Sequence, residues 1–569
     1  MAKRVLIIGA VALGPKAASR CKRLMPEAEV TLIDQSSRIS YGGCGIPYFI
    51  SDEVKNVTEL QATPYGAVRD AQFFESHKNI KVLSNCRATR INRNEKNVTV
   101  QQLTDGSSAI LAYDSLVLAL GSSPNRPQIP GLDLEGISTA TNLDEAEYIK
   151  KALAGQGVSR AVVVGGGFIG LELAVAIGEK WKIPTSIVEI APQILPNFLS
   201  FSLARMAQND LNSRNITVHT GEKVLRFEGR DGRVAKVVTD KREIAADLVI
   251  MSAGVHPNTD IAKEAGLTVS EKGLLVVDEH LRTSDPDIYA GGDCVTIPNQ
   301  ITQKPGWYPL GSLANRQGRV IGTNLAGGNA RFDGAVGAWG VKLCALNAAG
   351  AGLTLEAALR EGFDAISVQV LQTAHAHFFP ENAPMSMELV LDKKTGRVLG
   401  IQGISSAGDA LAARINPVAA LLPHKVGLEE ISNLEVLYSP PFASAMDIVN
   451  TLGNVADNVL SGLYQPMTLE EFDAAWANRK NEIFYLLDAR PRNWGAALAE
   501  KYPEDWHNIP QDEVAQRLTE IPADRPIIIT CKSGLRAYEA QLVLRQAGRE
   551  NTKAVFGGVS ASTLFGTKF

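Results

Sequence analysis

Short apolar runs alternate along the chain with segments of helical pattern, and one such unit occurs twice. The first run is VLIIG at residues 5–9, and it leads into AVALGPKAASRCKRL, whose small and basic residues favour a helix. A second strand, VTLID, follows and ends in Asp34. The copy reads AVVVGGGFIGLELAVAIGEK and then TSIVE, which ends in Glu189. The pattern predicts two βαβ units of the nucleotide-binding type.

Glycines shape the turn of each unit. They let the backbone approach a pyrophosphate, while the helix N-terminus offers free N–H groups and the acid after the second strand reaches a ribose. The second unit has the complete GxGxxG pattern in Gly165, Gly167 and Gly170, so we expect it to bind a dinucleotide. The first unit keeps Gly9 and Gly14 but has valine at the middle position, so on its own it fits a simple tight turn equally well.

Three further segments extend the pattern. DSLVLALGSSPNRPQIPG at residues 114–131 and DLVIMSAGVHPNTD at 247–260 each predict an apolar strand that ends in a small-residue turn. TSDPDIYAGGDC at 283–294 places Asp293 after a Gly-Gly turn. With these segments, residues 3–452 resemble the two-dinucleotide flavoproteins of the pyridine nucleotide-disulfide oxidoreductase family.

The resemblance implies two cofactors. The first unit would hold FAD, with Gly9, Gly14 and Asp34 at its pyrophosphate and adenosine ribose and Asp293 at the ribityl chain. The second unit would hold NAD(P)H through its three glycines and Glu189. A carboxylate at the ribose favours NADH because it repels a 2′-phosphate, and no arginine follows in IAPQILPNF. NADPH is the alternative, because some members of the family accept both.

A single cysteine, Cys44, lies in SYGGCGIPYF at residues 40–49, without the second cysteine of a CxxxxC pair. This segment resembles the single-cysteine branch of the family, which includes coenzyme A-disulfide reductases, NADH peroxidases and NADH oxidases. In that branch Cys44 would alternate between a thiolate beside the flavin and a mixed disulfide or a sulfenic acid. The branch often has asparagine before the cysteine, whereas this chain has Gly43. The alternative is a small buried apolar residue.

The first predicted helix is basic. Lys16, Arg20, Lys22 and Arg23 lie close enough in sequence to share a face, which suits the phosphates of coenzyme A. The alternative is an ordinary solvated helix face. By resemblance, the substrate-binding residues are Lys16, Arg20, Arg23 and Ser40.

The segment at residues 333–452 resembles the dimerisation domain of the family. It ends in YSPPFASAMDIVN, where Tyr438 would reach the active site of the partner subunit, or would simply pack on a loop. HAHFFP at 375–380 has Phe379 where relatives often have a tyrosine, so a hydroxyl that could donate a proton is missing.

The last hundred or so residues predict a separate small α/β domain beyond GNVADNVLSGLYQP at 453–466, which reads as a loop. Strands FYLLDAR and PIIITC, a helix at 536–548 and AVFGGV alternate there. CKSGLR runs from Cys531 to Arg536 and resembles the loop of rhodanese-type sulfurtransferases, which carries sulfane sulfur as a persulfide. Asp488 and Arg490 fit that family's Asp-x-Arg, although EDWHNIP only loosely matches its usual Gly-His-Ile segment. The alternative is an inactive domain used for docking.

Composition excludes several classes of protein. The 569 residues suffice for several domains, and 57 basic against 61 acidic residues give a net charge of -4, so no broad attraction to nucleic acid or to an anionic membrane is expected. The six cysteines lack CxxC spacing, which argues against a metal site and a disulfide framework. Neither a signal peptide nor a membrane span is recognisable, so we expect a cytoplasmic protein.

These observations predict an α/β protein with two Rossmann-like nucleotide-binding domains, an α+β dimerisation domain and a C-terminal α/β rhodanese-like domain. The expected boundaries are 1–118 with 263–326 for FAD, 145–262 for NAD(P)H, 333–452 for dimerisation and 467–569 for the rhodanese-like domain. The predicted function is reduction of coenzyme A persulfide or polysulfide by a homodimer. The alternatives are coenzyme A-disulfide reduction, peroxide or oxygen reduction through a Cys44 sulfenic acid, and a redox sensor with a docking tail.

Overall fold

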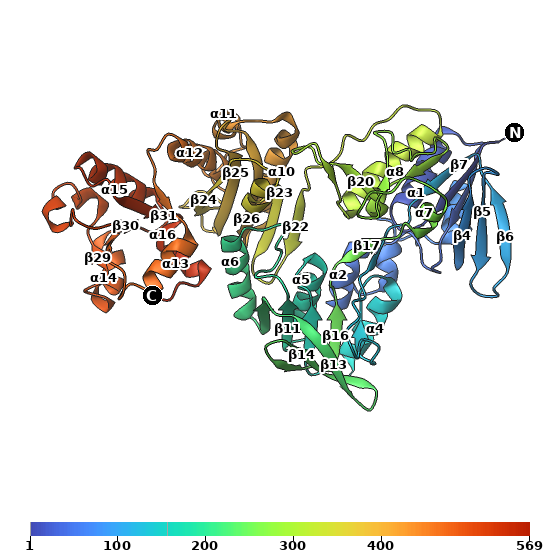
Figure 1. Ribbon diagram of the computed structural model, residues 1–569, viewed down its shortest axis with the longest axis horizontal. Coiled ribbons are helices and arrows are strands. Elements are labelled where there is room, and N and C mark those ends of the chain that lie inside the picture. Colours follow the sequence, from blue (N-terminus) through green and yellow to red (C-terminus); the bar gives the residue numbers. More distant parts are fainter. Residues whose placement is uncertain (1, 156) are drawn as a thin grey trace. The chain divides into compact units, whose positions relative to one another are not determined.

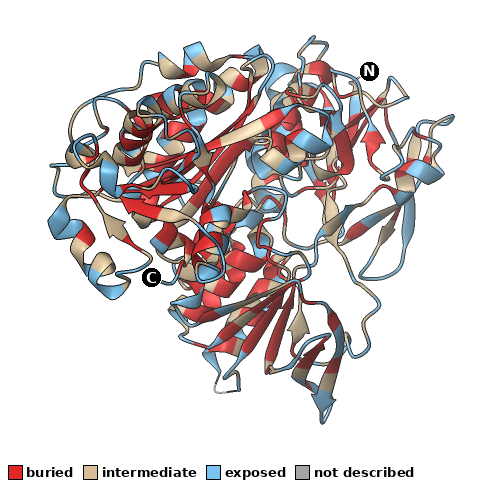
Figure 2. Cartoon of the chain, turned by 60° about the vertical axis from the view of Figure 1, so that its left-hand side comes forward, coloured by how far each residue is buried: buried red, intermediate tan, exposed pale blue. Residues whose placement is uncertain are grey.

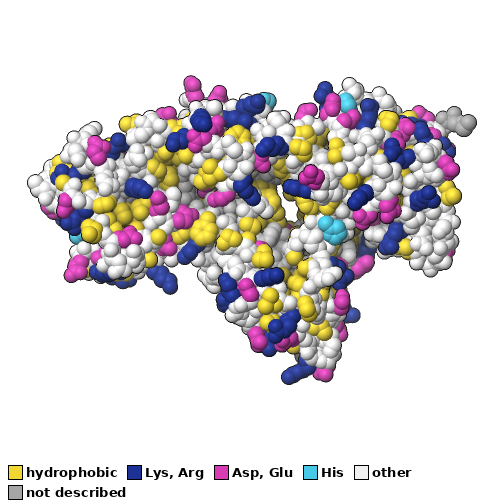
Figure 3. Space-filling model, viewed as in Figure 1, with side chains coloured by type: hydrophobic (Ala, Val, Ile, Leu, Met, Phe, Trp, Pro, Cys, Tyr) yellow, Lys and Arg dark blue, Asp and Glu magenta, His cyan; other side chains and the backbone are white. Residues whose placement is uncertain are grey.

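The computed structural model describes residues 2–155 and 157–569 (Figure 1). It forms two compact units, Met1–Ile190 with Glu222–Gly337 and Ala191–Gly221 with Ala338–Phe569. In both units the central strands of the main sheets are buried along most of their length, while the outer faces of the helices are exposed (Figure 2). Basic and acidic side chains alternate over the face drawn in Figure 3, as the near balance of charge predicts.

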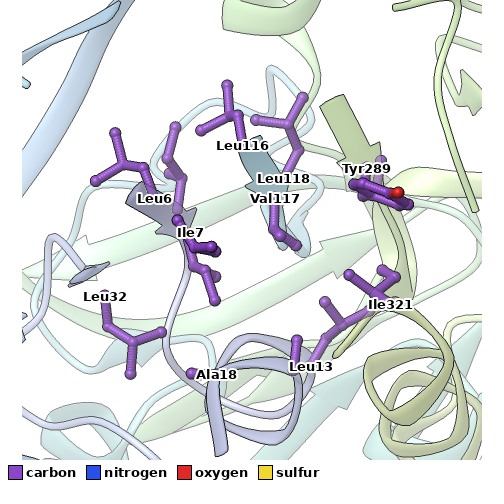
Figure 4. Packing of buried hydrophobic residues seen from close by; sticks show 14 of the residues in the cluster. Leu6, Ile7, Leu13, Ala18, Leu32, Leu116, Val117, Leu118, Tyr289 and Ile321 are labelled. Atoms are coloured by element: carbon purple, nitrogen blue, oxygen red, sulfur yellow. The ribbon is translucent and has the colours of Figure 1, made fainter. Parts of the chain in front are cut away.

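The first βαβ unit lies in a parallel sheet of the order β19-β7-β1-β2-β3. Its strands are β1 (Arg4–Ile8), β2 (Glu29–Ile33), β3 (Lys81–Leu83), β7 (Ser115–Leu118) and β19 (Ile288–Ala290). Helices α1 (Leu13–Leu24) and α8 (Gly311–Leu325) pack against each other beside it. Ile7, Leu32 and Leu116 from the strands and Ile321 from α8 are fully buried in the core between them (Figure 4).

The second βαβ unit has the same construction. Strands β11 (Thr185–Glu189), β10 (Ala161–Val164), β16 (Leu248–Met251) and β9 (Ile137–Ser138) pair in parallel in that order. Helix α5 (Phe168–Val175) follows β10 and continues into a π-helical turn, η3 (Ala176–Lys180). The prediction of two Rossmann-type units is therefore confirmed.

Smaller elements complete the first unit. They are α2 (Ile46–Ile50), α3 (Ala71–Lys78), α4 (Leu143–Ala154), α7 (Asp260–Glu264), β4 (Cys86–Asn92), β5 (Asn97–Gln102), β6 (Ser108–Ala112), β8 (Ser122–Pro124), β13 (Val224–Arg230), β14 (Arg233–Thr239), β15 (Glu243–Ala245), β17 (Val255–Pro257), β18 (Leu275–Val276), β20 (Val295–Pro298) and β21 (Pro305–Gly306).

The second unit contains an antiparallel sheet of the order β22-β23-β26-β25-β24. Its strands are β22 (Trp339–Lys342), β23 (Asn347–Gly352), β24 (Ala365–Thr373), β25 (Pro384–Asp392) and β26 (Val398–Ser405). The helices around it are α6 (Phe201–Asn212), α9 (Leu355–Arg360), α10 (Gly408–Leu421), α11 (Leu428–Ser432) and α12 (Ile448–Leu460). Helices and antiparallel strands together give the α+β character that was predicted for residues 333–452.

The interpretation of residues 453–466 as a loop is wrong for their first half, because α12 runs through Leu460. The Asp447 side chain caps the helix N-terminus by accepting a hydrogen bond from the Val449 N–H. Gly453, which made the segment look like a loop, lies so close to α11 that a Cβ there would overlap Ser432 Oγ. Packing on α11 and the sheet therefore outweighs the weak helix propensity of the glycine.

The C-terminal part of the chain forms a second sheet in this unit, all parallel, of the order β27-β31-β30-β28-β29. Its strands are β27 (Pro466–Met467), β28 (Tyr485–Asp488), β29 (His507–Asn508), β30 (Ile527–Thr530) and β31 (Thr552–Val555), and its helices are α13 (Leu469–Ala477), α14 (Arg492–Lys501), α15 (Leu535–Gln546) and α16 (Gly558–Phe565). The α/β pattern predicted for this tail is confirmed. The individual domain boundaries stay a prediction.

None of the helices in the described residues has the length and apolar character needed to cross a membrane. Within the same residues, no group of His, Cys, Asp and Glu side chains has an arrangement that could hold a metal ion.

Candidate active site

The first glycine turn closes tightly after β1. A Cβ on Gly9, whose φ is +102°, would overlap the Ala119 carbonyl oxygen, and a Cβ on Gly14 would overlap the carbonyl oxygen of Gly9. Asp34 Oδ2 accepts a hydrogen bond of 2.7 Å from the Ala10 N–H, and burial raises the pKa of this carboxyl. The acid at the end of β2 thus supports the turn, and its second oxygen accepts from the Ser36 N–H.

The second turn repeats this geometry. A Cβ on Gly170 would overlap the carbonyl oxygen of Gly165, and Glu189 Oε2 accepts a hydrogen bond of 2.6 Å from the Gly166 N–H. Gly167, at the N-terminus of α5, differs because a Cβ there would meet no atom within 4 Å. The space above the free N–H groups of this helix suits a pyrophosphate, so the residues fit a dinucleotide.

Asp293 lies in the 3-10 turn η4 (Gly292–Cys294), directly after β19. Its Oδ2 accepts a hydrogen bond of 2.8 Å from Ser122 Oγ, and burial raises its pKa. Because β19, β7, β1 and β2 are parallel, their carboxyl ends meet at one edge of the sheet, which brings Asp293 to the same edge as Gly9 and Asp34. The predicted FAD residues therefore lie together.

Cys44 lies in the 3-10 turn η1 (Gly43–Gly45), which runs directly into α2. The residue is exposed, and a Cβ on Gly311, the first residue of α8, would lie 4.0 Å from its Sγ. The positive end of the α8 dipole favours a thiolate at this position. In the opposite direction, partial shielding of the sulfur from water raises the thiol pKa, and the carboxylates of Glu172 and Asp293 add to this effect.

Sequence reasoning missed two groups beside Cys44. The Tyr48 hydroxyl of α2 donates a hydrogen bond of 3.4 Å to Glu172 Oε1 of α5. Burial raises the pKa of Glu172 to about 7, while the bond from Tyr48 acts in the opposite direction. Tyr48 follows the cysteine in the segment CGIPYF, and Glu172 lies in the segment GFIGLE at the start of α5. Both segments were identified from the sequence, but no local pattern links the two side chains.

The basic residues of α1 do not all belong to one cluster. Lys22 Nζ donates to the carbonyl oxygens of Pro26 and Ala28, just beyond the end of the helix, so its ammonium is directed toward that backbone. Arg20 Nε donates a hydrogen bond of 3.1 Å to Thr323 Oγ1. The backbone N–H of the buried Ser40 donates to the Ala10 carbonyl oxygen next to the first turn.

Lys16 and Arg23 lie near two further cations from other segments. The pKa of Lys78 is lowered by burial and then by the charges of Arg23, Arg69 and Lys16. Lys78 Nζ also donates a hydrogen bond to Ser19 Oγ on α1. A region that gathers these four cations suits a polyanionic ligand. Arg69 and Lys78 escaped the sequence analysis because they come from separate segments.

The loop that carries Tyr438 is held by a buried arginine. Arg414 Nη2 lies 2.9 Å from Asp447 Oδ2 and also donates to the carbonyl oxygens of Ala374 and Phe442. Tyr438 itself is 50% exposed. Its neighbours on these loops form an exposed apolar set of Phe378, Leu437, Phe442 and Met446.

Cys531 lies at the carboxyl end of β30 and is 1% exposed. Its Sγ accepts a hydrogen bond of 3.1 Å from the Gly534 N–H, in a loop that opens α15. The guanidinium of Arg536 lies 5.7 Å from the ring centroid of Trp494, and Lys532 Nζ lies 5.0 Å from the same ring. The Gly534 N–H, the N-terminus of α15 and the cations Lys532 and Arg536 give this loop a positive potential.

Asp488 and Arg490 form a structural pair beneath this loop. Asp488 is fully buried, accepts several hydrogen bonds from the Arg490 guanidinium, and accepts one of 2.9 Å from Trp506 Nε1. The loosely matching EDWHNIP segment therefore provides a partner of the Asp-x-Arg pair. Sequence reasoning missed both Trp506 and the half-exposed Trp494.

Three family models match the chain. The model for pyridine nucleotide-disulphide oxidoreductase matches residues 3–308, its dimerisation domain matches 339–449, and the rhodanese-like domain matches 469–563. A curated relative from Pyrococcus abyssi, named NAD(P)H sulfur oxidoreductase (CoA-dependent), is 33% identical over 80% of this chain and 98% of its own length.

Two solved structures match nearly the whole chain. An NAD-dependent persulfide reductase from A. fulgidus has a TM-score of 0.92 at 35% identity and covers 98% of this chain and 99% of its own. Reduced CoADR-RHD from Bacillus anthracis has a TM-score of 0.89 at 28% identity and covers 99% of this chain and 98% of its own. These matches confirm the resemblance and the fold class inferred from the motifs. The chain belongs to the pyridine nucleotide-disulphide oxidoreductase family and carries its dimerisation domain and a rhodanese-like domain.

Proposed function

We propose that this protein is an FAD-dependent NAD(P)H reductase of persulfides and polysulfides, with coenzyme A persulfide as the substrate of Cys44. The observation that carries the proposal is that one chain combines a single cysteine, which is near Asp293 and Glu172 of the two nucleotide-binding units, with a second cysteine in a rhodanese-type loop. The relatives named for CoA-dependent sulfur reduction and for persulfide reduction support it.

The two glycine turns would hold the cofactors, with Gly9, Gly14, Asp34 and Asp293 for FAD and Gly165, Gly167, Gly170 and Glu189 for NAD(P)H. When bound, the flavin supplies two-electron transfer between NAD(P)H and a sulfur. The Cys44 thiolate attacks the thiol-side sulfur of coenzyme A persulfide, a Cys44–coenzyme A disulfide forms, and hydrosulfide leaves with the electron pair of the broken bond. Two electrons then cleave that disulfide and regenerate the thiolate and coenzyme A.

Cys531 would collect sulfane sulfur from bulky donors as a persulfide and pass it on. The loop N–H of Gly534 stabilises its anion, and Arg536 adds positive charge. Lys16, Arg20 and Arg23, together with Ser40 near the first turn, would bind the phosphate-bearing substrate. Arg69 and Lys78 extend this positive region.

We also propose a homodimer through the matched dimerisation domain. The exposed apolar set around Tyr438 would be covered by the second copy, and Tyr438 would then lie at the partner's active site. Sedimentation equilibrium of the whole protein tests this, since a monomer at micromolar concentration would contradict it. The six cysteines, which lack CxxC spacing, support the predicted cytoplasmic location.

Two measurements test the function. Mass spectrometry of ligands released from the denatured protein should show FAD and coenzyme A. NADH consumption should then be compared with coenzyme A persulfide, polysulfide, coenzyme A disulfide, peroxide and oxygen, and the first two should be fastest. Faster turnover of coenzyme A disulfide, or of peroxide or oxygen, would support the corresponding reductase or oxidase instead, and no turnover with any acceptor would support a sensor.

Glu189→Ala should raise the use of NADPH relative to NADH. The substitution removes the negative charge at the end of β11, which would repel a 2′-phosphate, and also the acceptor for the Gly166 N–H. We expect the NADH to NADPH preference in kcat/KM to fall about tenfold, which corresponds to about 1.4 kcal/mol. Steady-state kinetics with both nucleotides measure it, and an unchanged preference would place Glu189 away from that ribose.

A further inference from the structure

Helix α2 joins the redox cysteine to the nucleotide-binding helix. Cys44 and Tyr48 are four residues apart where η1 runs into α2, so they lie about one helical turn apart on the same face. The Tyr48 hydroxyl reaches Glu172 of α5, and Trp181 Nε1 after η3 donates a hydrogen bond of 2.9 Å to the Ile50 carbonyl oxygen. Two separate bonds therefore hold α2 against the α5 segment.

The groups that face this region are mostly acidic. Glu172 faces Tyr48 and the Cys44 thiol, Asp293 also faces the thiol, and Glu53 faces Tyr48. The nearby cations Lys150 and Lys180 pair with Asp52 instead. A thiolate at Cys44 therefore adds a negative charge to a half-buried site that already contains carboxylates, and neighbouring groups of like charge resist joint ionisation.

We propose that Glu172 and Cys44 share a single ionisation, in which Glu172, held by Tyr48, takes up a proton when Cys44 becomes a thiolate and releases it when Cys44 enters a disulfide. The proposal rests on the redox role of Cys44 in the proposed function. It also supplies a proton near the sulfur.

The proton balance follows from the two steps at Cys44. When the thiolate attacks the persulfide, it loses its charge, hydrosulfide leaves, and the Glu172 carboxyl gives its proton to produce neutral hydrogen sulfide. When two electrons from NAD(P)H cleave the mixed disulfide, the Cys44 sulfur regains its charge, Glu172 takes one proton, and the coenzyme A thiolate takes another. The hydride of NAD(P)H, which carries two electrons and one proton, and one proton from solvent together supply these two protons.

The test is the pH dependence of Cys44 alkylation by iodoacetamide in the reduced holoenzyme, followed on the Cys44 peptide by mass spectrometry. Glu172→Gln removes the competing charge with almost no change in shape. We expect it to lower the midpoint of the profile by about one pH unit, which is about tenfold more thiolate at a given pH below the wild-type midpoint. A Cys44 thiolate beside the bound flavin should also give a long-wavelength absorption band. In Glu172→Gln this band should persist to lower pH by the same amount.

Two control variants separate charge from helix position. Trp181→Phe breaks the other hydrogen bond between the two segments without changing charge, and Glu53→Gln removes a carboxylate that faces Tyr48 but not the thiol. Both should keep the wild-type midpoint. An unchanged midpoint in Glu172→Gln, or an equal shift in either control, would overturn the proposal. Alkylation of Cys44 requires no turnover, so this test does not depend on whether persulfides are the substrate.

Discussion

Cys44→Ser should abolish NADH-dependent reduction of every sulfur substrate, with a loss of turnover on the order of a thousandfold or more. A hydroxyl at this position is not ionised near neutral pH and cannot form a disulfide, so both the attack on sulfur and the acceptance of electrons are lost. Stopped-flow measurement of NADH oxidation with coenzyme A persulfide and with polysulfide provides the readout. The long-wavelength band on partial reduction should vanish in the same variant.

Cys344→Ser is the matched control, since Cys344 is a partly exposed cysteine in the other unit of the chain. It should keep wild-type turnover and the band. Retained sulfur reduction in Cys44→Ser with FAD bound at full occupancy would assign the reductive step to another group, and retention of the band would place a different donor beside the flavin.

Cys531→Ser should separate the two sulfur sites. Turnover with polysulfide or protein-bound sulfur should fall about tenfold or more, because sulfur is no longer captured on the same chain at high effective concentration. Reduction of preformed coenzyme A persulfide should stay within about twofold of wild type, because Cys531 takes no part in hydride or electron transfer in the proposed mechanism. Steady-state NADH oxidation with both kinds of substrate measures the difference.

The outcomes of this comparison exclude one another. Equal losses with both substrates would mean that Cys531 takes part in the reductive step. No loss with either would leave the rhodanese-like domain as a docking module. A loss restricted to the bulky donors supports the capture role, and Cys344→Ser again provides the unaffected reference.

Short sequence patterns were sufficient to predict the two glycine turns and to single out Cys44 and the Cys531 loop as candidate sites. Each depends on a few consecutive residues whose backbone geometry is largely local: a Cβ on Gly170, for example, would overlap the carbonyl oxygen of Gly165 in the same turn. The order of these motifs along the chain was also sufficient to predict the family, and the comparisons with known proteins confirmed that prediction.

Helix α12 and Lys22 show where local pattern misled. The glycine and asparagines at the start of GNVADNVLSGLYQP favour a loop when they are considered alone, but burial against α11 outweighs their weak helix propensity. Lys22 resembled its basic neighbours in sequence, yet its ammonium binds the carbonyls at the end of α1, so it does not face the positive region around Lys78.

The amino-acid sequence was thus enough to predict the two Rossmann-type units and the rhodanese-like domain, which are confirmed, and to single out Cys44 and Cys531 as candidate residues. Three-dimensional packing was needed to bring Glu172 to Tyr48, Arg69 and Lys78 to α1, and Trp494 to the Cys531 loop. The physical reason is distance along the chain. Side chains on separate elements acquire their partners, burial and charge environment only after those elements pack, and no local pattern carries that information.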